Sequence, residues 1–124
     1  MSANHAHSNP QYIGPGTWNA IHTLAFNAKN ATKQQQCIKN IKMLCKQFPC
    51  EKCREHALDY IKTHPMGHSK EKELGLFIWT WKFHNTVNFR IGKPNMSWDM
   101  AYHLYDSLKQ SDNQECSEEC SVSE

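Results

Sequence analysis

The chain has 124 residues, of which 21% are charged, and its formal net charge is +2. Lys and Arg are scattered among Asp and Glu, so no basic face of the kind that binds nucleic acid is expected. No apolar run is long enough to span a membrane, and the polar N-terminus does not resemble a signal peptide, so we expect a cytoplasmic protein.

The length predicts one domain, which we place at residues 12–110. Residues 1–11 are polar, and we expect them to be disordered. Residues 111–124 contain one apolar side chain apart from two cysteines, which is too little to pack a core. We therefore expect a flexible tail that carries a cysteine pair.

The spacing of apolar residues is helical throughout the predicted domain. A first helix is expected over 16–28, after the turn Gly14-Pro15-Gly16, and a second over 32–47. The second helix must end near Phe48, because a residue before proline avoids the helical region. The residues that share one face of the first helix are Trp18, Ile21, His22 and Ala25.

Three further helices complete the predicted domain. The third is expected over 49–63, since proline is favoured at the first helical position. The fourth is expected over 70–91, and the fifth starts with Ser97 as its N-cap and runs to about residue 110. The residues of the fifth helix expected to point inward are Trp98, Ala101, Tyr105 and Leu108. Five amphipathic helices with short connections predict an all-α helical bundle.

The pattern Cys50-Glu51-Lys52-Cys53 directly follows Phe48-Pro49. Two thiols three positions apart at a helix start can close a small disulfide. The positive end of the helix dipole favours the thiolate, which is the form that attacks disulfides. The pattern alone also fits half of a zinc site or two unreactive thiols.

Six cysteines without a secretory signal indicate metal binding or thiol chemistry, because cytosolic proteins rarely hold structural disulfides. Cys37 and Cys45 are eight positions apart on one predicted helix, or about 12 Å, which is beyond the reach of a disulfide. We expect buried free thiols, and the alternative is a bridge between subunits by either cysteine.

The predicted fourth helix changes character along one face. This face is apolar as far as Trp81 and then carries His84, Asn85 and Asn88. Buried amides need partners, so the polar end predicts a polar ligand. With Trp18 on the first helix, this arrangement suits a flat heteroaromatic ring with polar edges.

Three segments resemble motifs of the flavin-dependent sulfhydryl oxidases of the Erv/ALR family, in the family's order and at about its spacing. Residues 14–25 resemble the opening motif, Phe48-Pro49-Cys50-Glu51-Lys52-Cys53 the active-site motif, and residues 84–94 the FAD-binding motif. The resemblance covers about residues 12–108. It implies a four-helix bundle with a short fifth helix, which encloses FAD and forms a homodimer.

The resemblance also implies the chemistry. Such an enzyme oxidises protein dithiols or thioredoxin-like substrates and passes the electrons to molecular oxygen, which gives hydrogen peroxide. Carried over by position, Cys50 exchanges with the incoming thiol, and Cys53 lies against the flavin ring. The cofactor-binding residues implied are Gly14, Trp18, His22, Tyr60, Trp81, His84, Asn85, Asn88, Lys93 and Tyr105.

Cys116 and Cys120 lie on the predicted tail. A second cysteine pair on a flexible arm often acts as a shuttle in this family, so the resemblance implies that role here. The shuttle would pass electrons to Cys50 of the same chain or of a second subunit. The alternative is an adventitious pair.

The chain departs from the family pattern at one place. Cellular members carry a structural disulfide that pins the fifth helix, and Trp81 and Trp98 occupy those positions here. Members encoded by large DNA viruses often lack that bridge. The resemblance therefore implies a viral protein, in the cytoplasm of an infected cell and associated with virions, with the mitochondrial intermembrane space as the alternative.

Two other interpretations remain open. A zinc-binding interaction module could use Cys50 and Cys53 with His56 and His64, although no second cysteine pair stands at finger spacing. A thioredoxin-like oxidoreductase needs alternating strands and helices around the two cysteines, which the periodicity does not indicate.

Overall fold

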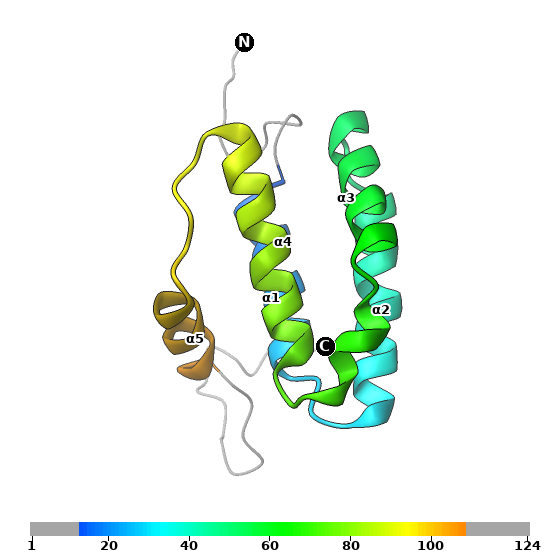
Figure 1. The fold of residues 1–124 in the computed structure, drawn as a ribbon, viewed down its shortest axis with the longest axis vertical. Helices are drawn as coiled ribbons and strands as arrows, with labels where there is room; N and C mark the ends of the chain where they lie inside the picture. Colours follow the sequence, from blue (N-terminus) through cyan, green and yellow to red (C-terminus); the bar gives the residue numbers. More distant parts are fainter. Residues whose placement is uncertain (1–12, 109–124) are drawn as a thin grey trace, which may run out of the picture.

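Every element is helical in residues 13–108, the part of the chain that the computed structural model describes. The elements are α1 (Pro15–Phe26), α2 (Ala31–Lys46), α3 (Glu51–Thr63), the 3-10 helix η2 (Met66–Glu71), α4 (Gly75–Ile91) and α5 (Trp98–Asp106). α1 packs on α4 and α2 packs on α3, while the short α5 lies against the first pair (Figure 1). The predicted all-α bundle with a short fifth helix is confirmed.

Side-chain oxygens cap the start of two helices. Asn30 accepts the N–H of Lys33 at 2.9 Å at the start of α2. Ser97 accepts the N–H of Met100 at 3.1 Å at the start of α5, so the predicted N-cap is confirmed. Each bond satisfies a backbone donor that has no partner within its own helix.

The third helix begins later than predicted. Pro49 lies outside it, and Cys50 is the N-cap, with its sulfur accepting the N–H of Cys53 at 3.2 Å. The prediction that Pro49 opens the helix is wrong by two residues, because a thiol acceptor at position 50 fixes the start.

The start of α4 also differs from the prediction over 70–91. Residues Met66–Glu71 form η2, and α4 begins only at Gly75. A Cβ on Gly75 would lie 1.8 Å from the carbonyl oxygen of Ser69, so only glycine lets the two backbones approach this closely. Apolar periodicity does not show such an approach.

The segment after α4 returns along the same helix toward α5 (Figure 1). Gly92 has φ 79° and ends α4, and the N–H of Lys93 donates to the carbonyl oxygen of Asn88 at 2.8 Å. Trp81 and Trp98 then meet edge to face, with ring centroids 5.4 Å apart at 71°. Such a pair contributes about 0.5–1.5 kcal/mol beyond its buried area, so it helps hold α5 without a covalent link.

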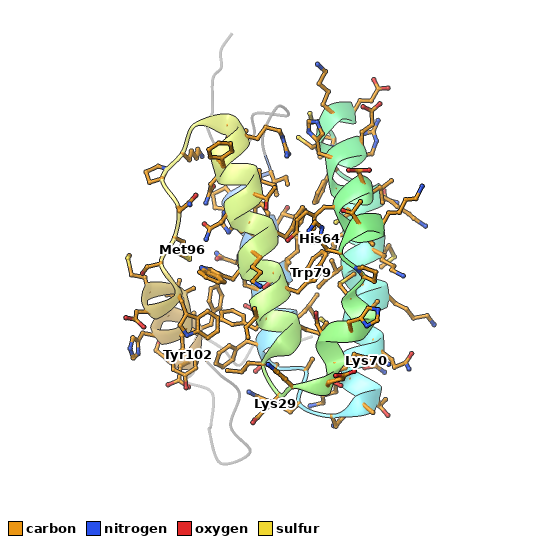
Figure 2. All side chains as sticks on the ribbon, in the orientation of Figure 1. Lys29, His64, Lys70, Trp79, Met96 and Tyr102 are labelled. Carbon is orange, nitrogen blue, oxygen red and sulfur yellow. The ribbon has the colours of Figure 1, made fainter. Side chains whose placement is uncertain are left out.

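One hydrophobic core joins the helices. Ile21, Ile41 and Phe77 are completely buried in it. At one side of this core, the indole N–H of Trp79 donates to the carbonyl oxygen of His64 at 2.6 Å and ties α4 to the end of α3 (Figure 2). Truncating a completely buried phenylalanine such as Phe77 to alanine costs about 3–5 kcal/mol.

The inward face of α5 is predicted correctly except at its end. Ala101 and Tyr105 are buried, but Leu108 is 63% exposed, because the helix ends at Asp106 and the chain leaves the inward face.

Along residues 13–108, no helix combines the length and apolarity that crossing a bilayer requires.

Cys37 and Cys45 are free thiols with exposed fractions of 2% and 0%. Burial raises the pKa of each thiol to about 12. The prediction of buried free thiols is confirmed, and a bridge between subunits by either cysteine is incompatible with this burial.

Candidate active site

Cys50 and Cys53 are half-buried reduced thiols at the N-terminal end of α3. Cys50 occupies the N-cap position, which oxygen-bearing side chains usually hold. The guanidinium of Arg54 donates to the carbonyl oxygens of Phe48 at 2.6 Å and Pro49 at 3.3 Å. Arg54 therefore clamps the turn that presents Cys50.

The surroundings separate the two thiols. The pKa of Cys50 is lowered, mainly by hydrogen bonding with Cys53 and more weakly by the positive charge of Arg54. Burial raises the pKa of Cys53 to about 11, hydrogen bonding with Cys50 adds to the rise, and the charge of Arg90 opposes it. Cys50 is therefore the thiol that more readily becomes a thiolate, which suits it for exchange with a partner.

A groove of about 370 Å³ lies beside the cysteine pair. It is lined by Ile13, Cys50, Lys52, Cys53, His56, Val87, Arg90 and Ile91. A second hollow of about 230 Å³ shares Ile13, Val87 and Ile91 with this groove. A third hollow of about 800 Å³ shares His56 and Arg90 with it. The three hollows border one another through these shared residues along the C-terminal half of α4, and we call the three together the arc.

The residues predicted to bind the cofactor are divided among these hollows. Those that line the second hollow are Trp18, His84, Asn88, Lys93 and Tyr105. Those that line the third are Tyr60, Trp81 and Asn85. Gly14 is the N-cap of α1, where its carbonyl oxygen accepts the N–H of Trp18 at 3.1 Å, and His22 is buried below the second hollow.

Aromatic rings form one wall of the second hollow. Trp18 and His84 stack with centroids 3.7 Å apart and planes 5° apart. His22 lies 5.1 Å from His84, nearly parallel to it. Tyr105 completes the wall, and its hydroxyl donates to Asn19 at 2.9 Å. The hollow therefore presents a flat surface of the kind that binds a planar ring.

A chain of hydrogen bonds fixes the protons on the two histidines. The hydroxyl of Thr80 donates to the carbonyl oxygen of Phe77 at 2.8 Å, so its oxygen accepts from Nδ1–H of His22 at 2.9 Å. Nε2 of the neutral His22 then accepts from Nδ1–H of His84 at 2.9 Å. Nε2 of the neutral His84 is left as an acceptor.

Burial keeps both rings neutral. It lowers the pKa of His22 to about 3, with a contribution from His84, and the pKa of His84 to about 4, with a contribution from Lys93. Since neither ring is charged at neutral pH, the direction of this hydrogen-bond chain is the same in every folded molecule.

The two amide side chains of α4 have different roles: one binds a backbone segment, and the other lines the second hollow. Both polar atoms of the Asn85 side chain bond to the backbone of Met96, and the indole N–H of Trp81 donates to the same Met96 carbonyl. Asn88 is buried, and its side chain donates to that of Asn85 at 3.4 Å. Asn88 lines the second hollow, whereas Asn85 and Trp81 secure the segment that leads to α5.

Tyr60 lies between α3 and α4. Its ring stacks on that of His64 at 4.1 Å and lies 5.2 Å from that of Phe83. Burial raises the pKa of its hydroxyl, and a hydrogen bond with Thr86 opposes the rise. Tyr60 therefore forms part of the wall of the third hollow, away from the stack of Trp18 and His84.

Sequence reasoning missed three residues that shape this site. Thr80 lies four positions before His84 on α4, so the same spacing that linked His84 to Asn88 could have revealed it. Arg54 binds the carbonyl oxygen of Phe48, and Asn19 accepts from the hydroxyl of Tyr105. These contacts form only in the folded chain, and no sequence pattern indicates them.

The donor set of the arc fits a ligand with flat heteroaromatic rings and phosphates. The stacked wall offers ring contacts, the buried amide of Asn88 and Nε2 of His84 offer hydrogen-bonding atoms, and Lys93 brings a positive charge to the same hollow. The groove beside Cys53 borders this hollow at Ile13, Val87 and Ile91. A long ligand could therefore contact the aromatic wall and Cys53 together.

The zinc alternative finds no ligand group. Within residues 13–108, no three His, Cys, Asp or Glu side chains are arranged to hold a metal ion. His56 borders the groove with the cysteines, but His64 stacks on Tyr60 in the third hollow.

Cys116 and Cys120, and the predicted boundaries at residues 11 and 110, lie outside the described residues.

Comparison with known proteins identifies relatives of the whole helical part. The model of the Erv1 / Alr family matches residues 15–113. A protein named FAD-linked sulfhydryl oxidase, from African swine fever virus (isolate Pig/Kenya/KEN-50/1950), is 31% identical over 96 residues, which cover 75% of this chain and 79% of the relative. A plant protein, FAD-linked sulfhydryl oxidase ERV1 of Arabidopsis thaliana, is 30% identical over 84 residues, which cover 65% of this chain and 43% of the relative.

Proposed function

The chain belongs to the Erv1/Alr family, and we propose that it is an FAD-linked thiol oxidase that forms disulfides in protein dithiols and reduces oxygen to hydrogen peroxide. One observation carries this proposal. The cysteine pair at the start of α3 lines a groove that shares Val87 and Ile91 with the aromatic and amide-lined hollow. A dithiol centre and a site for a planar ligand thus share one arc.

This chain's residues would hold FAD in distinct ways. Trp18, His84 and Tyr105 supply flat surfaces for its rings, Asn88 supplies an amide, and Lys93 supplies positive charge for the phosphates. When bound, FAD accepts two electrons from thiols and returns them to oxygen.

The cysteines perform the exchange with substrate. A substrate thiolate attacks the Cys50 sulfur of a Cys50–Cys53 disulfide, forms a mixed disulfide and releases Cys53. The second substrate thiolate then attacks the substrate sulfur of this mixed disulfide and releases the thiolate of Cys50, so the substrate leaves as a disulfide. Two electrons are now held by the reduced cysteine pair.

The charges around the pair support this order. Two of the effects that raise the pKa of Cys53, a hydrogen bond and a charge, come from the sulfur of Cys50. Both effects end once Cys50 is in a mixed disulfide, while the positive charge of Arg90 remains. Cys53 is therefore a better leaving group in the exchange than in the reduced pair.

We also propose the finer properties that the resemblance implies. Cys116 and Cys120 act as the shuttle that delivers electrons to Cys50, the enzyme is a homodimer, and it acts in the cytoplasm of an infected cell, associated with virions. The similarity to oxidases of African swine fever virus supports the last point. Light scattering on the purified protein tests the dimer.

The test of the proposed function is a visible absorption spectrum of the purified protein before and after anaerobic dithiothreitol. We expect a flavin spectrum that bleaches with the dithiol and recovers in air, with hydrogen peroxide formed. A colourless protein that contains stoichiometric zinc would contradict the proposal and would make the cysteine pair structural.

A further inference from the structure

Three positive charges lie close to the cysteine pair and outnumber the two exposed carboxylates beside it on α3, Glu51 and Glu55. Lys52 and Arg90 line the groove beside it, and the charges of Arg54 and Arg90 act on Cys50 and Cys53 respectively. No acidic side chain lines the groove within the described residues. We define Lys52, Arg54 and Arg90 as the basic rim.

The chain itself contains a segment of the opposite charge. Residues 111–124 hold five of the 12 Asp and Glu residues and none of the 14 Lys and Arg residues. Two of these carboxylates, Glu118 and Glu119, lie between Cys116 and Cys120, and Glu115 directly precedes Cys116. Each thiol of this segment is thus within two positions of a negative charge.

The segment is long enough to reach the groove. It follows α5, which contacts α4 at Phe77, whereas the groove borders α4 at Arg90. The 13 positions between them span about 20 Å along the helix. The 12 residues from Leu108 to Cys120 can extend over about 40 Å, which leaves a margin for a path around the bundle.

We propose that the basic rim is a docking surface for acidic dithiol peptides and that its occupant is the segment 111–124 of this chain. This inference rests on the proposed function and adds the basis on which the site selects its thiol partner. Attraction between the rim and the carboxylates raises the local concentration of Cys116 and Cys120 beside Cys50.

The exchange that follows starts from the Cys50–Cys53 disulfide and moves two electrons from the tail to this pair. The thiolate of one tail cysteine attacks the sulfur of Cys50, which forms a mixed disulfide and expels the thiolate of Cys53. The second tail thiolate then attacks the first tail sulfur and expels Cys50. The tail becomes a Cys116–Cys120 disulfide, and the two electrons reside on the reduced Cys50 and Cys53 pair.

The test uses the full chain with its FAD, with Cys116→Ser and Cys120→Ser, and with the carboxylates of its own segment 111–124 replaced by the matching amides, so that an added peptide supplies the only tail dithiol and the only acidic tail. One peptide has the sequence of residues 111–124, and a second has Gln in place of each Glu and Asn in place of Asp112. At low salt we expect kcat/KM for the acidic peptide to exceed that for the neutral peptide by about tenfold. About 0.5 M NaCl should abolish the difference, because it screens the rim.

A charge reversal locates the effect. Lys52→Glu should lower kcat/KM for the acidic peptide by about tenfold relative to dithiothreitol, which also reports any change in the cysteine pair itself. Lys62→Glu, on the same helix but outside the groove, should change neither substrate. Equal rates for the two peptides at low salt, or equal losses in both variants, would overturn the docking surface. Oxidation of dithiothreitol but of neither peptide would also overturn it and leave the oxidase function standing, whereas failure with dithiothreitol would count against the oxidase function itself.

Discussion

The side chain of Asn85 pairs with both backbone groups of Met96. Its Oδ1 accepts the Met96 N–H at 2.7 Å, and its Nδ2 donates to the Met96 carbonyl oxygen at 2.9 Å. The amide therefore replaces a backbone partner for an irregular segment that has no regular hydrogen bonding of its own. Through this segment α4 fixes the position of α5, and with it Tyr105 in the wall of the second hollow.

Asn85→Ala should release the segment between α4 and α5. We expect a loss of about 2 kcal/mol in the free energy of unfolding, since three hydrogen bonds of the Asn85 side chain are lost and the Met96 N–H becomes unsatisfied, while the Met96 carbonyl keeps the bond from Trp81. Urea unfolding measures the loss, and limited proteolysis should show new cleavage within 92–97. Asn95→Ala, at an exposed position in the same segment, is the control. An unchanged midpoint in Asn85→Ala would show that Met96 does not depend on this amide.

Thr80→Val should weaken FAD binding although Thr80 lines none of the three hollows. The valine cannot accept from His22, so the proton order that leaves Nε2 of His84 as an acceptor is no longer imposed. Titration of the FAD-free protein with FAD should show an increase in Kd. Loss of a buried hydrogen bond costs about 1–3 kcal/mol. Thr80→Ser keeps the hydroxyl and should retain most of the affinity, and equal affinity in the two variants would refute this role.

Stability should fall in mild acid. The pKa of His22 is lowered to about 3 in the folded chain, against about 6.5 when unfolded. As the pH falls below 6.5, the unfolded chain binds a proton that the folded chain rejects, so the free energy of unfolding decreases toward pH 3. His22 alone accounts for about 2 kcal/mol at pH 5. Urea midpoints from pH 7.5 to 5 measure the slope. His22→Asn should reduce the slope by about half, since His84, whose pKa is lowered to about 4, contributes about as much. The exposed His103→Gln should not reduce it, and an unchanged slope in His22→Asn would exclude this origin.

Arg54→Met should shift the reactivity of Cys50. The charge of Arg54 lowers the pKa of Cys50, and its side chain holds the Phe48–Pro49 turn. In the reduced protein, alkylation of Cys50 by iodoacetamide should reach half its maximal rate at a higher pH than in the unmodified chain. Mass spectrometry of the Cys50 peptide follows the reaction. Lys62→Met is the matched control, and superimposable pH profiles for all three proteins would disprove the effect.

Cys53→Ser should abolish turnover with dithiothreitol while FAD stays bound, because the cysteine pair can no longer close a disulfide. Cys45→Ser removes a thiol that is buried on α2 and lines none of the three hollows. It should keep its activity despite some loss of stability. Oxygen consumption and the visible spectrum together check both variants, and turnover by Cys53→Ser would require a different redox pair.

Periodicity was a sound guide to the helices and a poor guide to their ends. All five predicted helices are present, since burial of one face determines them. Their starts depend on single contacts, such as the sulfur of Cys50 at α3 and the carbonyl of Ser69 beside Gly75 at α4. Contacts of this kind involve the backbone, and the apolar pattern does not record them.

The candidate site shows the same division. The cysteine pair and the aromatic and amide residues of α1 and α4 could be named from the sequence, because motif and spacing place them on shared faces. Their separate tasks could not. Asn85 and Asn88 look equivalent in the sequence, yet Asn85 holds Met96 and Asn88 borders the hollow. Only the return of the chain along α4 distinguishes the two amides.

The sealed thiols of α2 have a consequence for handling the protein. This disulfide-forming enzyme carries two oxidisable thiols of its own, Cys37 and Cys45, and their burial keeps them from reacting. Any event that opens the core exposes both to the oxidising centre of a neighbouring molecule. Heating in air should therefore be irreversible, with mixed disulfide oligomers as the end product, whereas heating under a reductant should allow refolding. The lifetime of the enzyme is thus linked to how rarely α2 leaves the core.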